Sequence, residues 1–147
     1  MEGKLGRPEE TVVKANVVRG VPQVLQSSSR EIGFHGEDIA VKYLEALGLS
    51  IVCRNFRSRF GEVDLIAKDG DTTVFVEVKT RTSGLFGKAI EQIGRGKRQK
   101  IMKSALMYLA KTGALGSNVR FDVLAIDILR GGSHRVELVK GAFNGWR

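Results

Sequence analysis

Apolar residues recur at every second position along two adjacent stretches of the chain: Val63, Leu65 and Ala67, and then Val74, Val76 and Val78. A period of two is typical of β-strands, because successive side chains point to opposite faces of a sheet. Asp69-Gly70 lies between the stretches and favours a tight turn, since glycine readily adopts the positive φ that such turns need. The pattern therefore predicts a β-hairpin over about residues 62–81.

Two acids and one amine are expected to meet on the other face of this hairpin. Glu77 and Lys79 lie two residues apart in the second strand and share a face with Phe75. A two-residue turn at Asp69-Gly70 would bring Asp64 to the same face, opposite Phe75 and diagonal to Glu77. The alternative is an ordinary solvated strand face with Asp64 as a turn-side acid.

The rest of the chain predicts helices and further strands around the hairpin. We expect helices over residues 31–47, 89–93 and 97–111, and strands over 49–56, 118–128 and 135–140. Ile51 and Cys53 are expected to share one strand face. The order of elements predicts an α/β fold in which helices flank a mixed central sheet, with the long helix crossing over to the fourth strand. Residues 1–30 hold both prolines and read as a flexible N-terminal extension, so residues 31–147 form the predicted domain.

Composition narrows the class of protein. The 147 residues carry a net charge of +8, which favours polyanionic partners, with nucleic acid ahead of membrane, although charge can also serve solubility alone. A single cysteine allows no intrachain disulfide and fits a reducing compartment. Neither a membrane-spanning apolar segment nor a secretory signal is apparent, so we expect a cytoplasmic protein.

Neighbouring carboxylates in apolar surroundings point to a divalent cation, because two adjacent negative charges repel and Mg²⁺ prefers carboxylate oxygens. Glu37 lies on or beside the buried face of the first predicted helix and could be a third acid of the site, or simply a first-turn acid favoured by the helix dipole. Basic residues near the hairpin and at the start of the long helix are candidates for phosphate binding, or for a solvated surface. They are Arg54, Arg57, Lys97, Arg98 and Lys100.

An ordered series of motifs resembles the bacterial YraN-like family over about residues 31–145. The motifs are Gly36-Glu37-Asp38-Ile39-Ala40, Arg54-Asn55-Phe56-Arg57, Gly61-Glu62-Val63-Asp64-Leu65-Ile66, Val74-Phe75-Val76-Glu77-Val78-Lys79-Thr80-Arg81, Lys97-Arg98-Gln99-Lys100 and Arg120-Phe121-Asp122-Val123. That family is similar to the PD-(D/E)XK nuclease superfamily, with its restriction endonuclease-like fold, and nearest in pattern to the archaeal Holliday junction resolvases. The proline of the superfamily name is absent, since Val63 precedes Asp64.

The resemblance implies that Asp64 and Glu77 bind Mg²⁺ or Mn²⁺, that Lys79 is the catalytic lysine and that Glu37 completes the site. We therefore expect a metal-dependent DNA endonuclease, with branched or junction DNA as a candidate substrate. A junction-cutting enzyme makes two cuts, which favours a homodimer. One alternative is a nucleic-acid-binding protein of the same fold that does not cut, and another is an assembly protein whose charge is incidental.

Overall fold

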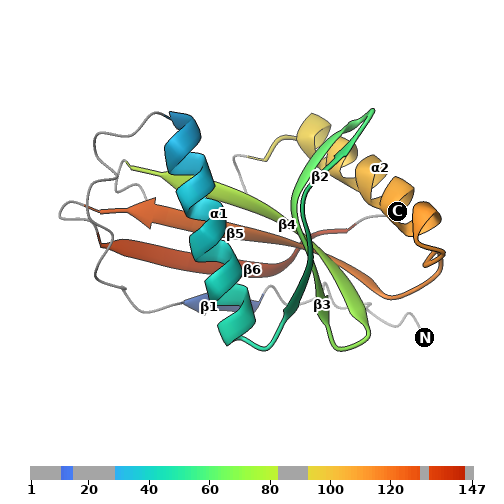
Figure 1. The fold of residues 1–147 in the computed structure, drawn as a ribbon, viewed down its shortest axis with the longest axis horizontal. Helices are drawn as coiled ribbons and strands as arrows, with labels where there is room; N and C mark the ends of the chain where they lie inside the picture. Colours follow the sequence, from blue (N-terminus) through green and yellow to red (C-terminus); the bar gives the residue numbers. More distant parts are fainter. Residues whose placement is uncertain (1–10, 15–28, 83–92, 130–132, 145–147) are drawn as a thin grey trace, which may run out of the picture.

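The computed structural model describes residues 11–14, 29–82, 93–129 and 133–144. Two helices and six strands lie in these residues (Figure 1). In chain order they are β1 (Thr11–Lys14), α1 (Ser29–Ala46), β2 (Ser50–Ser58), β3 (Gly61–Asp69), β4 (Thr72–Arg81), α2 (Arg95–Lys111), β5 (Val119–Ile128) and β6 (His134–Phe143).

The strands form one mixed sheet in the order β1-β6-β5-β4-β3-β2. Neighbouring strands are antiparallel except β4 and β5, which are parallel and are connected through α2. A parallel pair needs such a crossover because the chain must return to the same end of the sheet. The predicted fold class is confirmed: the protein is an α/β domain with helices flanking a mixed sheet, consistent with the restriction endonuclease-like fold.

The two helices cover opposite faces of the sheet. Val74 and Val76 of β4 point into a core with Ala40 and Leu44 of α1. Phe75, between them, points into a second core with the apolar face of α2, formed by Ile101, Ala105 and Leu109. In Figure 1, α1 crosses one face of β4, β5 and β6. Strand β4 is therefore buried on both sides, which accounts for its continuous apolar run.

The register of the central hairpin differs from the prediction. Asp69 pairs with Thr72, so the two turn residues are Gly70 and Asp71, and Ile66 rather than Asp64 lies opposite Phe75. Gly70 adopts a positive φ of 57°. The turn still has two residues, so this shift does not by itself change the face that a side chain takes, but every pairing moves by two positions.

Strands β2 and β3 are irregular at Asn55 and Asp64, which lie between two regular pairs of the ladder. Residues on either side of this point pair as Arg54 with Leu65 and Phe56 with Val63. Asn55 adopts a left-handed conformation with φ 52°. The regular alternation is broken here: Val63 packs in the core under α2, whereas Leu65 packs under α1. The expectation that these two side chains share a face was wrong.

A second irregularity lies nearer the start of β2. The register shifts between Ile51 and Cys53, as in a β-bulge. Ile51 packs against the core under α1, and Cys53 against the core under α2. The prediction that they share one face was therefore wrong, because an inserted residue reverses the sides of those beyond it.

Part of the expected N-terminal extension belongs to the sheet, since β1 pairs with β6 at one edge. Residues 1–10 and 15–28 lie outside the described part of the chain, as does most of the helix expected over residues 89–93. Within the described ranges, neither helix combines the length and the apolar character needed to cross a membrane.

Candidate metal centre

The candidate site forms where β3 separates from β4. The ladder between these strands ends at the Leu65–Val76 pair, although both strands continue beyond it. Past this point the backbone nitrogen of Val78 donates a 2.8 Å hydrogen bond to Oδ2 of Asp64. A carboxylate thus takes the place of a backbone partner, and the Asp64 side chain is fixed against the strand that carries Glu77.

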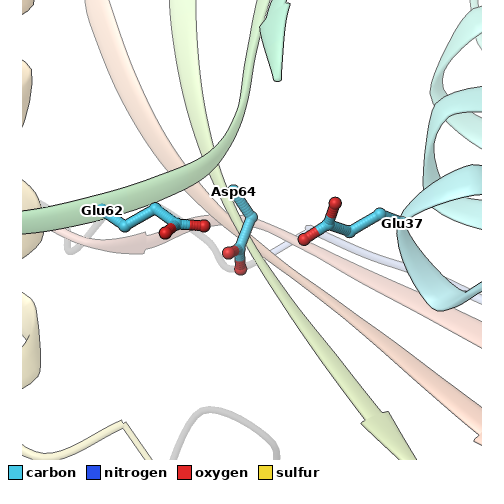
Figure 2. Close-up of side chains that lie close together, drawn as sticks. All are labelled: Glu37, Glu62 and Asp64. Atoms are coloured by element: carbon cyan, nitrogen blue, oxygen red, sulfur yellow. The ribbon is translucent and has the colours of Figure 1, made fainter. Parts of the chain in front are cut away.

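Three acids converge in front of this separation. Carboxylate oxygens of Glu37, Glu62 and Asp64 all lie within 4.8 Å of one another. Glu37 comes from α1 and the other two from β3, and Figure 2 shows their carboxylates pointing toward one another. Each residue is half-buried, so the group is partly shielded from water.

Two contacts hold Glu37 in position. The Nδ2 of Asn55 donates a 3.1 Å hydrogen bond to Glu37 Oε2, so the left-handed residue of β2 directly supports the site. One residue earlier, Gly36 packs so closely on Thr80 of β4 that an added Cβ would overlap the threonine hydroxyl. A glycine at this point lets α1 approach the sheet closely enough for Glu37 to reach Asp64.

Glu77 is the most buried acid of the site, with only 5% of its side chain exposed. Its Oε1 lies 3.8 Å from Nζ of Lys79 and 3.5 Å from Nζ of Lys97, which comes from the first turn of α2. Its Oε2 is buried and accepts no hydrogen bond from any described residue. A buried carboxylate oxygen without a partner is costly, so this atom is available for a ligand.

The pKa values of Asp64 and Glu37 are raised in the folded protein. Burial, together with the neighbouring charge of Glu77, raises the pKa of Asp64 to about 7, although the Val78 amide opposes this. Burial also raises the pKa of Glu37, and the charge of Asp64 adds to that effect against the hydrogen bond from Asn55. Both shifts have burial as their largest cause, and the crowding of acids adds to it.

The donor atoms fit a hard divalent cation. They are carboxylate oxygens, one of them a buried oxygen without a hydrogen bond, as Mg²⁺ and Mn²⁺ prefer. A cation would also relieve the repulsion that raises the pKa of Asp64. Asp64 and Glu77 would hold it between adjoining strands, with Glu37 and Glu62 within reach of Asp64.

The four residues expected at the site, Glu37, Asp64, Glu77 and Lys79, lie together in the fold. Glu62 joins them and was missed, although its position two residues before Asp64 in the same strand could have indicated it. Their assignment as metal-binding and catalytic residues stays a prediction.

The basic residues expected to bind phosphate have mixed surroundings. Arg54 forms a 2.8 Å ion pair with Asp38 and lies 3.9 Å from Glu37, while Arg57 lies 3.4 Å from Glu62. The Nε of Arg98 donates a 3.0 Å hydrogen bond to the carbonyl of Ile93, and Lys100 is exposed. Two of the arginines thus contact acids at or beside the site.

Asp122 lies apart from the site and has a structural role. Its fully buried carboxylate accepts two hydrogen bonds from Arg120 and one from the backbone nitrogen of Gly141. These contacts lie at a register shift between β5 and β6. Asp122 therefore holds β5 and β6 together where their register changes.

Comparison with known proteins identifies one family. The model of the uncharacterised protein family UPF0102 matches residues 36–126, a range that includes every site residue from Glu37 to Lys97. A UPF0102 protein of Geobacter sulfurreducens is 47% identical over 112 residues, covering 76% of this chain and 88% of the relative. One of Rhodococcus jostii is 48% identical over 112 residues, covering 76% and 95%. One of Desulfosudis oleivorans is 43% identical over 115 residues, covering 78% and 91%.

Proposed function

The chain belongs to the protein family UPF0102, the YraN-like family, and we propose that it is a metal-dependent endonuclease that hydrolyses phosphodiester bonds in DNA. One observation carries the proposal: carboxylate oxygens of Glu37, Glu62 and Asp64 lie within 4.8 Å of one another. The buried Glu77 is a further charged neighbour of Asp64. Partly buried acids that meet in this way, one of them with a raised pKa, are candidates for binding a cation or for taking part in chemistry.

The site residues divide into those that would bind the metal and those that would take part in the reaction. Asp64 and Glu77 would hold a divalent cation, which when bound supplies a water of lowered pKa and neutralises charge on the phosphate. Lys79, with Nζ 3.8 Å from Glu77, would orient the attacking water or stabilise the charge that develops on the phosphate. Glu37 would accept a hydrogen bond or a proton from the water.

The surface around the hairpin tip supports a polyanionic substrate. Arg57 and Arg59 are exposed at the tip between β2 and β3, and Lys100 and Lys103 are exposed on α2. The tip is fixed to the helix by a 2.7 Å hydrogen bond between the hydroxyls of Ser58 and Ser104. Cations on this surface would bind backbone phosphates, which gives affinity without sequence choice.

A nicking assay on linear duplex and on four-way junction DNA tests the proposal, with Mg²⁺ or Mn²⁺ and with EDTA. Wild-type protein is expected to cut in the presence of metal, while Asp64→Ala and Lys79→Ala lose at least about a hundredfold in rate but still bind DNA. The likeness to junction resolvases favours the branched substrate.

The other outcomes separate the alternatives. Equal weak cutting by all three proteins would reveal a contaminating nuclease. Binding that weakens steeply with salt, without any cutting, would identify the non-cleaving nucleic-acid-binding protein. An absence of binding at physiological salt would leave the assembly protein.

A further inference from the structure

Lys97 brings a second ammonium group to the buried carboxylate of Glu77. It lies in the first turn of α2, and its Nζ is 3.5 Å from the same Oε1 that Lys79 approaches to 3.8 Å. The two lysines come from different elements, a strand and a helix on the face that Glu77 shares. Two cations on one oxygen are more than a simple ion pair requires.

The position of Lys97 is unfavourable for the helix itself. The N-cap residue Gly94 provides no side-chain hydrogen bond, and the first turn of α2 contains no acid. Cations near a helix N-terminus are repelled by the positive end of the helix dipole. The contact with Glu77 offsets this cost for Lys97.

Lys97 also acts on the second acid expected to hold the metal. Its charge lowers the pKa of Asp64, opposing the effects of burial and of Glu77. One ammonium group therefore serves Asp64 and Glu77 together, as a divalent cation would. Because like charges repel, the ammonium and a cation bound by the same acids would destabilise one another.

We infer that Lys97 is a second lysine of the active site, which neutralises Glu77 in the free protein and moves to a phosphate of the nucleic acid when a divalent cation binds. The inference rests on the proposed function and names the residue that couples the binding of metal to the binding of substrate. Its side chain is 44% exposed and its stem is flexible, so the ammonium can leave Glu77 without moving the helix.

Metal affinity measured without DNA tests the first half of this inference. Titration of Mn²⁺ into Lys97→Ala and Lys97→Gln is expected to show affinity about fivefold higher than in wild-type protein, because the competing cation is gone. Arg95→Ala is the matched control, because Arg95 is an exposed cation in the same turn of α2. Its loss changes the net charge by the same amount and removes a similar repulsion from the positive end of the helix dipole. Lys97→Arg should behave like wild-type protein.

DNA binding measured with Ca²⁺, which has the same charge as Mg²⁺, tests the second half of the inference. Lys97→Ala is expected to bind several-fold more weakly than wild-type protein, with the slope of log affinity against log salt reduced by about one. Mn²⁺ affinity in Lys97→Ala no higher than in Arg95→Ala would overturn the inference.

The two proposals can fail separately. Tighter Mn²⁺ binding by Lys97→Ala in a protein that cuts none of the substrates would support the role of Lys97 and overturn the endonuclease. Metal-dependent cutting with an unchanged Mn²⁺ affinity would support the endonuclease and overturn the role of Lys97.

Discussion

The amide of Val78 donates a 2.8 Å hydrogen bond to Oδ2 of Asp64, so a side chain of β3 stands where the backbone ladder with β4 has ended. This contact fixes an acid of one strand against the neighbouring strand that carries Glu77. It also keeps the two strands from closing on one another, which leaves room for the carboxylates of Glu37 and Glu62. The separation of β3 from β4 is therefore a part of the site.

Asp64→Asn should make the metal-free protein more stable at pH 8 by roughly 1–3 kcal/mol, measured by chemical denaturation. The pKa of Asp64 rises from 3.8 to about 7 on folding, so the folded state binds a proton that the unfolded state has lost. Stability from this group is thus complete at acid pH and declines as the pH rises from about 4 past 7. Asparagine keeps the shape without the charge.

The difference between Asp64→Asn and wild-type protein should be clearly smaller at pH 5 than at pH 8. It should vanish only below the unfolded pKa of 3.8, where Asp64 is protonated in both the folded and the unfolded state. Asp38→Asn, which changes an exposed acid of α1, is the control for net charge. A stability difference that is the same at pH 5 and pH 8 would contradict the raised pKa.

Affinity for Mg²⁺ or Mn²⁺ should depend on pH, falling about tenfold for each unit below about 7, because the metal must displace the proton of Asp64. Calorimetric titrations at pH 6, 7 and 8 measure this directly, and proton release appears as a dependence of the heat on the buffer. Asp64→Asn should bind metal too weakly to titrate. Affinity that stays constant over this range would place the metal elsewhere.

Glu62→Gln should weaken Mn²⁺ binding by about tenfold, because its carboxylate lies within 4.8 Å of those of Glu37 and Asp64. Glu45→Gln, an exposed acid near the end of α1, should leave the affinity unchanged. The pair separates a local ligand from a general effect of charge. Equal affinities for the two variants would remove Glu62 from the site.

The period-two pattern of the central hairpin predicted that Asp64 and Glu77 lie close together. It predicted neither the pairing of the two strands nor the break in alternation between Val63 and Leu65. Turns at Asp69-Gly70 and at Gly70-Asp71 both have two residues, and they differ in register by two positions. Both therefore satisfy the same alternation, which distinguishes only odd shifts. Tertiary contacts, which the alternation does not encode, decide between the two turns.

The surroundings of the site could be predicted less well than its acids. The left-handed Asn55 and the bulge after Ile51 are backbone irregularities that no apolar pattern marks. They matter because Asn55 bonds to Glu37. Lys97 could be recognised as a helix cation, but its position over Glu77 depends on how α2 packs across the sheet.

The close approach of α1 to β4 gives a final prediction, in which the sign of the effect is decisive. Glycine to alanine within a helix usually stabilises it by about 0.5–1 kcal/mol. At Gly36 the added methyl group would overlap the hydroxyl of Thr80, so Gly36→Ala should instead destabilise the protein by roughly 1–3 kcal/mol. Chemical denaturation measures both quantities.

Gly96→Ala is the matched control, because Gly96 lies in α2 with open space where its Cβ would be. It should stabilise the protein slightly. Thr80→Ala removes the hydroxyl that Gly36→Ala meets, so the double variant should recover much of the lost stability, giving a coupling of about 1 kcal/mol or more. Since an enlarged residue 36 pushes Glu37 away from Asp64, Mn²⁺ affinity should fall in Gly36→Ala and return in the double variant. Strictly additive effects would show that the contact with Thr80 does not set the position of α1.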